Sequence, residues 1–234
     1  MNGAPPTRPW EHATVVSIEP ETARVATFRL RFATPVDFLP GQHVVVRLTA
    51  PDGYRAQRSY SIASAPDGGD ELDLAVERLD DGEVSGFLHD GVEVGDSLEV
   101  RGPIGGWFTW TGETPALLIG GGTGVVPLMS MLRHARATGG DARLLVSVRT
   151  PADLLYASEL RERPDTTVVY SRVTPPGSMR PAGRIGRDDV AALLAPGATT
   201  YLCGSSGFVE ATSALLVELG TDAATVRIER FGPS

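Results

Sequence analysis

The 234-residue sequence contains no lysine and a single cysteine, Cys203. Its 21 basic residues are therefore all arginine. One cysteine excludes an internal disulfide, and it also excludes an iron–sulfur cluster held by several thiolates of this sequence. The four histidines lie far apart and match no HExxH-type ligand pattern. We therefore expect no metal site.

Long apolar runs and basic tracts are also missing. No stretch of about 18 apolar residues occurs, so we expect no membrane span. Residues 1–6 lack the basic-then-apolar pattern of a secretory signal, which favours a cytoplasmic protein. The net charge of −8 without a basic cluster argues against nucleic acid as a partner. A hydrophobic content of 41% is enough for a sizeable core.

The first half of the sequence predicts an antiparallel β-barrel. Short β-branched or alternating runs are separated by turn signals such as Pro40-Gly41 and Pro66-Asp67-Gly68-Gly69. Regular spacing of this kind is typical of a barrel or sandwich. A short helix is expected at 84–89. The predicted strands are 13–18, 25–32, 43–48, 60–63, 71–78 and 97–101.

After Gly112 the pattern changes to strands that alternate with helices, which predicts a doubly wound parallel sheet. The predicted fold is therefore a two-domain β plus α/β protein, with domains 1–112 and 113–234. The predicted strands are 116–119, 143–148, 167–171, 200–203 and 226–231. The predicted helices are 127–137, 157–161, 188–194 and 208–219.

The strongest local motif is the segment Gly120-Gly121-Gly122-Thr123-Gly124, which follows an apolar strand and precedes a helix. Glycines allow the backbone to turn tightly and approach a diphosphate, and the helix N-terminus offers N–H groups to the anion. Pro127 suits the first helical turn. Val125 replaces the third glycine of GxGxxG, and no Walker lysine follows. A glycine-rich connection without a ligand is the alternative.

Two further clusters allow a structural or a functional interpretation. The segment from Gly102 to Phe108 is a turn with aromatic packing when taken alone. In the run 58–64, Arg58 suits a phosphate and Tyr60 suits an aromatic ring, although a surface strand explains these residues equally well.

Taken in order, these segments resemble the ferredoxin–NADP reductase superfamily, including flavin reductases and the reductase components of bacterial oxygenases. The resemblance extends from about Ala13 to Gly232. It implies an FAD-binding barrel and an NAD(P)-binding α/β domain. The residues that match its FAD-binding motifs are Arg58, Tyr60, Ser61, Val76, Arg78, Gly82, Val84 and Ser85. Those that match its nucleotide-binding motifs are Gly122, Thr123, Gly124, Pro127, Cys203 and Gly204.

The resemblance also implies a catalytic neighbourhood and a closing strand. Ser61, Cys203 and Glu229 match the residues that shape hydride approach and stabilise reduced flavin. Phe231, in the closing Glu229-Arg230-Phe231-Gly232, is expected beside the flavin ring. A small buried side chain at a strand end is the structural alternative for Cys203.

The cofactors implied are FAD and NADPH, with NADH as the alternative. Ser171 and Arg172 match the residues with which family members bind the 2′-phosphate, and Arg149 and Arg184 are candidates to join them. A surface arginine in an arginine-rich chain is the other interpretation. The implied partner is a separate redox protein, a ferredoxin or an oxygenase component. The oligomeric state is open, with a monomer favoured.

Two other functions remain open. One is a flavin reductase that releases its flavin as product, although the loop from Gly82 to Ser85 favours tightly held FAD. The other is a non-catalytic flavoprotein or a nucleotide-sensing module. A hydrolase is excluded because Gly204-Ser205-Ser206-Gly207 lacks Gly-x-Ser-x-Gly spacing and no histidine is placed as a base.

Overall fold

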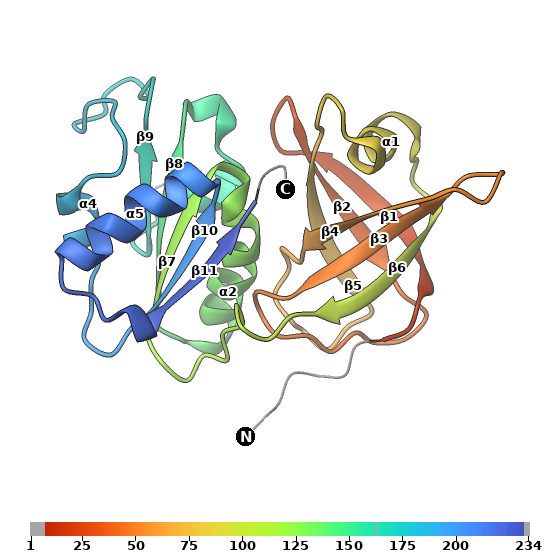
Figure 1. Ribbon diagram of the computed structural model, residues 1–234, viewed down its shortest axis with the longest axis horizontal. Coiled ribbons are helices and arrows are strands. Elements are labelled where there is room, and N and C mark those ends of the chain that lie inside the picture. Colours follow the sequence, from red (N-terminus) through yellow and green to blue (C-terminus); the bar gives the residue numbers. More distant parts are fainter. Residues whose placement is uncertain (1–7, 162, 232–234) are drawn as a thin grey trace. The chain divides into compact units, whose positions relative to one another are not determined.

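The computed structural model describes residues 8–161 and 163–231 (Figure 1). Gly232 of the predicted closing motif and the N-terminal residues 1–6 lie outside these ranges. The chain divides into two compact units between Thr109 and Trp110. Trp110 belongs to the second unit because its buried indole donates a hydrogen bond to the carbonyl of Thr114, 2.9 Å away.

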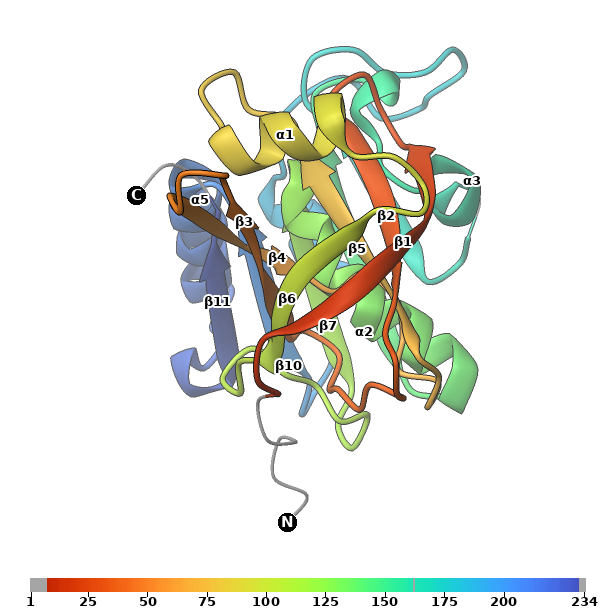
Figure 2. The ribbon, with the colours of Figure 1, turned by 90° about the vertical axis from the view of Figure 1, so that its right-hand side faces the viewer.

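The first unit is an antiparallel sheet that closes on itself. Its strand order is β4-β3-β6-β1-β2-β5. An isolated bridge between Ile62 and Leu74, and a bond from the Ala63 N–H to the Asp73 carbonyl, join the two outer strands. Figure 2 shows the curved strands with α1 at one end. The elements are β1 (Glu11–Pro20), β2 (Val25–Arg31), β3 (His43–Thr49), β4 (Arg55–Ser61), β5 (Glu71–Glu77), α1 (Glu83–Gly91) and β6 (Ser97–Ile104).

The prediction for strand β4 was displaced. The sequence predicted a strand at 60–63, but β4 begins at Arg55 and ends at Ser61. Ala56 and Tyr60 pack against the apolar core and Ser61 is buried, whereas the other residues of this strand are polar and exposed. Polar side chains of this kind protect the edge of a sheet from pairing with another chain. Because they replace apolar residues, the sequence lacks the apolar–polar alternation by which a strand is predicted.

The second unit contains a five-stranded parallel sheet in the order β11-β10-β7-β8-β9. The chain order reverses between β7 and β10, which is the switch point where ligands bind in open α/β sheets. The strands are β7 (Ala116–Gly121), β8 (Ala142–Val148), β9 (Thr166–Tyr170), β10 (Thr199–Gly204) and β11 (Val226–Arg230). The helices are α2 (Val125–Thr138), α3 (Ala157–Leu160), α4 (Arg187–Ala191) and α5 (Ser206–Glu218), with the 3₁₀ turns η1 (Gly122–Gly124), η2 (Pro151–Asp153) and η3 (Ala223–Thr225).

Helices cover both faces of this sheet, as the prediction of a doubly wound fold required. Leu117 and Ile119 of β7 point toward Val190 of α4 and Val209 of α5, in one buried cluster. Figure 1 shows α5 lying across this face. Helix α2 packs against β7, β8 and β10. Within the described residues, no helix is long and apolar enough to cross a membrane.

Candidate functional site

The glycine turn follows β7 directly and leads into α2. Strand β7 ends at Gly121, η1 runs from Gly122 to Gly124, and α2 begins at Val125. Gly122 has φ +57°, and a Cβ added there would meet no atom within 4 Å. The outer side of this turn is therefore open, and its glycine provides a conformation that other residues adopt with difficulty. Pro127 lies buried in the first turn of α2.

The inner side of the same turn rests on the end of β10. A Cβ on Gly124 would lie 2.3 Å from the carbonyl oxygen of Cys203 and 2.7 Å from the amide nitrogen of Gly204. Only glycine permits this backbone contact. The structure thereby brings together two motifs that are about eighty residues apart in the sequence, one on each side of the switch point.

Cys203 and Glu229 are neighbours across the β10–β11 pair. Cys203 is fully buried. Burial and, next, the charge of Glu229 raise the pKa of its thiol well above the usual value, so the thiol stays protonated. Burial likewise raises the pKa of Glu229 to about 7. The Oε2 atom of Glu229 is buried and has no hydrogen-bond partner among the described residues.

Phe208 is a residue of this site that the sequence analysis did not single out. A Cβ on either Gly121 or Gly204 would lie 2.7 Å from its ring, so the ring packs against both glycines. Its position four residues after Gly204, at the start of an apolar helix, is the sequence signal that was available. The N–H of Phe231 donates to the carbonyl of Gly204 at 3.0 Å, which holds the end of β11 at the same place.

Ser171 and Arg172 follow β9 at the carboxyl edge of the sheet. Their N–H groups donate to the carbonyls of Val148 at 2.8 Å and Arg149 at 2.9 Å. The backbone of Arg172 therefore lies beside that of Arg149, which follows β8. Both arginines are exposed.

In the first unit, Arg58, Tyr60 and Ser61 lie on β4. Arg58 is exposed and has no ion pair within the part of the chain that the structure describes; its Nη1 donates to the carbonyl of Gln57 at 2.7 Å. The hydroxyl of Tyr60 is buried and lacks a hydrogen-bond partner among the same residues. Burial raises the pKa of Tyr60 to about 12, against a smaller lowering by Arg58, so this hydroxyl is a donor at ordinary pH. Ser61 is buried and pairs across the strands with His43.

The loop before α1 has the form of an anion cradle. Gly82 precedes α1, whose first-turn N–H groups have no partner within the helix. A Cβ on Gly82 would collide with the Ser85 hydroxyl and lie 2.8 Å from the Cβ of Leu79, so a larger residue would displace that hydroxyl. That hydroxyl accepts from the Leu79 N–H at 3.2 Å and donates to the Gly82 carbonyl at 3.3 Å. The side chain of Ser85 therefore shapes the loop, and its backbone N–H is the group left for a ligand.

The side chains of Val76 and Arg78, which were predicted to line the flavin, have partners within the first unit, as does Val84, whose motif was predicted to hold the diphosphate through backbone N–H groups. Val76 and Val84 point into the barrel core. Arg78 forms an ion pair with Asp90, with its Nη2 2.8 Å from a carboxylate oxygen. The sequence placed these residues beside a motif but did not show the direction of their side chains. Only their backbone groups, or a rearranged Arg78, are left for a cofactor.

Removing the hydroxyl of Tyr60 is expected to stabilise the cofactor-free protein but to weaken its binding of FAD. Tyr60→Phe removes a buried polar group without a partner, so we expect the cofactor-free protein to become more stable by about 1 kcal/mol. On the predicted role of Tyr60 in binding FAD, the same change should weaken FAD binding by about fivefold, because the hydroxyl could no longer donate to the cofactor. Urea unfolding of the cofactor-free protein and FAD fluorescence titration measure the two effects. A less stable cofactor-free variant would contradict the assignment.

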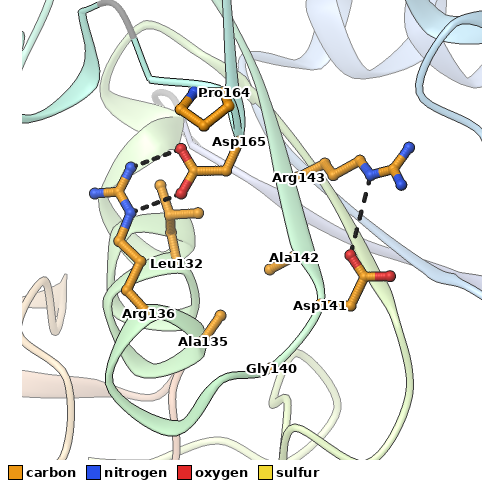
Figure 3. Close-up of a pocket in the computed structure, with 9 residues that line it drawn as sticks. All are labelled: Leu132, Ala135, Arg136, Gly140, Asp141, Ala142, Arg143, Pro164 and Asp165. Carbon is orange, nitrogen blue, oxygen red and sulfur yellow. Dashed lines mark hydrogen bonds and ion pairs between the residues drawn. The ribbon is translucent and has the colours of Figure 1, made fainter.

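A pocket of about 330 Å³ lies at the opposite end of the parallel sheet from the glycine turn (Figure 3). Gly140 and Pro164 lie just before the starts of β8 and β9, and Arg136 comes from the last turns of α2. Arg136 forms a two-point ion pair with Asp165 in this pocket, at 2.8 and 2.9 Å. None of the predicted site residues lines it.

Two family models match the chain, one in each unit. The oxidoreductase FAD-binding domain matches residues 12–109, and the oxidoreductase NAD-binding domain matches residues 118–214. These matches cover the two groups of site residues described above, apart from the closing strand β11.

Individual relatives agree with these matches. The reductase component of propane 2-monooxygenase from Mycolicibacterium goodii is 35% identical over 63% of this chain, which spans 43% of that protein. The ferredoxin–NAD(P)(+) reductase component of naphthalene 1,2-dioxygenase/salicylate 5-hydroxylase systems from Ralstonia sp. is 31% identical over 94% of this chain and 69% of its own length.

A solved structure has a similar fold. It is the flavohem-like FAD/NAD-binding domain of nitric oxide dioxygenase from Vibrio cholerae O1 biovar El Tor. It superposes with a TM-score of 0.83 at 28% identity, over 97% of this chain and 100% of that one. With both domain models and a relative matched over 94% of this chain in agreement, the chain belongs to the ferredoxin–NADP reductase superfamily of FAD- and NAD-binding oxidoreductases.

Proposed function

We propose that this chain transfers a hydride from NADPH to a bound FAD and passes the electrons to a separate redox protein. The observation that carries the proposal is the contact of Gly124 with the Cys203–Gly204 peptide at the switch point of the parallel sheet. This contact joins an open phosphate-binding turn to the strand end that carries Cys203, which lies beside Glu229.

The residues of the first unit fit an FAD. The N-terminus of α1 and the guanidinium of Arg58 would hold its diphosphate. The first is positively polarised, and Arg58 uses one Nη1 donor on the carbonyl of Gln57, which leaves its other N–H groups for an anion. The hydroxyl of Tyr60 would donate to the cofactor, which explains why it is buried without a hydrogen-bond partner among the described residues. Ser61 would lie against the flavin ring.

The residues of the second unit fit a dinucleotide. The open outer side of Gly122, with Thr123 and the first turn of α2, would hold the diphosphate. Cys203 and Gly204 would face the nicotinamide, and Phe231 would lie beside the flavin ring. The arginine after β9, Arg172, would bind the 2′-phosphate with Ser171, which favours NADPH over NADH.

When bound, FAD accepts a hydride and releases electrons one at a time, which is chemistry that no side chain supplies. The chain's residues position and tune this reaction. The thiol of Cys203 is small, buried and neutral, so it would let the nicotinamide lie close to the end of β10 without placing a charge there. Glu229, with its pKa raised to about 7, holds a proton at its carboxyl group below that pH and carries a negative charge above it.

The electron acceptor that we propose is a ferredoxin or an oxygenase component. The support is that relatives of this chain are reductase components of monooxygenase and dioxygenase systems. The chain spans only 43% of the first of these relatives. The acceptor is therefore inferred from the kind of protein that these relatives are, and not from a docking segment that they share with this chain.

The test is anaerobic. The protein is loaded with FAD and desalted, and the flavin absorbance is followed during titration with NADPH and, separately, with NADH. We expect the flavin to be retained and to bleach rapidly, with NADPH as the better reductant. Retained flavin that neither nucleotide bleaches would overturn the proposal in favour of a non-catalytic flavoprotein. Flavin that washes away but is reduced during turnover would identify a flavin reductase.

A further inference from the structure

The connection between β9 and α4 is an irregular loop, residues 171–186, which leaves the carboxyl end of β9 (Figure 1). Its two ends are tied together, because the N–H of Gly183 donates to the carbonyl of Tyr170 at 3.0 Å. The loop is therefore closed at its neck. It begins at the same edge of the sheet as the glycine turn, since the carboxyl ends of parallel strands share one edge.

Arg180 holds this loop with every donor that it has. Its Nε and Nη2 atoms donate to the two carboxylate oxygens of Asp189 at 2.9 and 2.7 Å. Its other three N–H groups donate to the carbonyls of Pro181 at 3.1 Å, Gly183 at 3.3 Å and Arg184 at 2.9 Å. A guanidinium has five N–H donors, so none is left for a ligand.

Asp189 anchors this arginine to α4. Its Oδ2 atom also accepts from the N–H of Gly186 at 2.8 Å. Burial of Asp189 opposes its ionisation, but the hydrogen bonds from Arg180 and Gly186 outweigh that effect and hold the pKa of the carboxyl below its usual value. The two-point ion pair is therefore fully charged at neutral pH, with the geometry in which such pairs are strongest.

The backbones of three other arginines, Arg149, Arg172 and Arg184, lie at or next to the neck of the loop, and these arginines have no ion pair within residues 8–161 and 163–231. Arg172 begins the loop and donates its N–H to the carbonyl of Arg149, 2.9 Å away. Arg184 ends the loop, and its carbonyl is held by Arg180. All three side chains are exposed at the neck. Arg180 thus holds the carbonyls of Gly183 and Arg184, next to the bond from the Gly183 N–H to the Tyr170 carbonyl that closes the loop.

We propose that Arg180 is a positioning residue that organises Arg149, Arg172 and Arg184 into a site for a phosphate monoester, the 2′-phosphate of NADPH. The inference rests on the proposed function, whose nucleotide preference it explains. Long arginine side chains on a mobile loop would lose much conformational freedom on binding, and a loop fixed in advance reduces that loss. Arg180 itself does not touch the nucleotide.

The test compares Arg180→Lys with wild type in the full-length, FAD-loaded protein. Lysine keeps the charge but cannot make five directed bonds. We expect the KM for NADPH to rise about tenfold, whereas the KM for NADH and the rate at saturation stay within twofold. By calorimetry, the Kd of adenosine 2′,5′-bisphosphate should rise by a similar factor and that of 5′-AMP should not. Arg187→Ala, which removes an exposed arginine of α4, is the matched control.

Two outcomes would overturn the inference. One is an equal rise of KM for NADPH and NADH, which would show that Arg180 only maintains the fold. The other is wild-type protein that binds adenosine 2′,5′-bisphosphate no more tightly than 5′-AMP. Flavin bleaching by NADH would, in that case, still support the proposed hydride transfer. If Arg180→Lys does not fold, Asp189→Asn, which retains Arg180 but removes its charged partner, should change the same constants in the same direction.

Discussion

Gly124→Ala is expected to lower kcat/KM for the nucleotide about 100-fold and to destabilise the protein by about 2 kcal/mol. The reason is steric. The new methyl group would lie 2.3 Å from the carbonyl oxygen of Cys203 and 2.6 Å from its carbonyl carbon. These are backbone atoms of a strand in the middle of a sheet, so they cannot turn away as a side chain can. Either the glycine turn or the end of β10 must move.

The measurement is stopped-flow reduction of bound FAD together with urea unfolding. Gly207→Ala is the matched control, because a Cβ at this position in α5 meets no atom within 4 Å. Alanine in a helix should stabilise that variant by up to about 1 kcal/mol and leave reduction unchanged. Gly124→Ala with wild-type kinetics would show that the turn and the strand end are not coupled, which would remove the main support for the nucleotide site.

The second large effect is a pH dependence that Glu229 produces. Its pKa is raised by burial from 4.5 to about 7 in the folded protein. Between these two pH values the folded state retains a proton that the unfolded state has released. The free energy of unfolding therefore falls as the pH rises through this window, and it is level below and above it. The total loss is on the order of 3 kcal/mol.

Glu229→Gln removes this ionisation and preserves the shape of the side chain. We expect the stability of the variant relative to wild type to increase steadily from pH 5 to pH 7 and then to level off. Urea unfolding at half-unit intervals of pH measures this difference, in which other titrating groups cancel. Parallel curves for the two proteins would show that the carboxyl group is hydrated and has an ordinary pKa, which would withdraw its proposed role near the nicotinamide.

Local patterns explain why the two halves of the fold could be predicted. The alternation of Leu72, Leu74 and Val76 and the succession of strands and helices after Gly112 arise from neighbouring residues, whose periodicity reports which face is buried. Strand β4 was misplaced for the same reason. It lies at a sheet edge where Arg55, Gln57 and Arg58 are exposed, so its sequence carries little apolar signal.

Side-chain directions could not be predicted in the same way. Val76 and Val84 belong to motifs associated with flavin, yet the barrel core holds their side chains. Arg78 pairs with Asp90, which lies on the next helix. In each case the sequence showed that the residue belongs to a motif. It did not show whether the side chain contacts a ligand or the interior of the protein.

The sequence alone determined the two domain types, the glycine turn and the Cys-Gly strand end, because each depends on residues adjacent in the chain. The tertiary structure decided which of these segments meet. Gly124 contacts the Cys203–Gly204 peptide, and Glu229 lies opposite Cys203 in the register of β10 and β11. Arg180 donates its five N–H groups to three carbonyls of its own loop and to the Asp189 carboxylate of α4. Such contacts depend on strand order, on register and on the removal of side chains from water, which no local pattern of residues encodes.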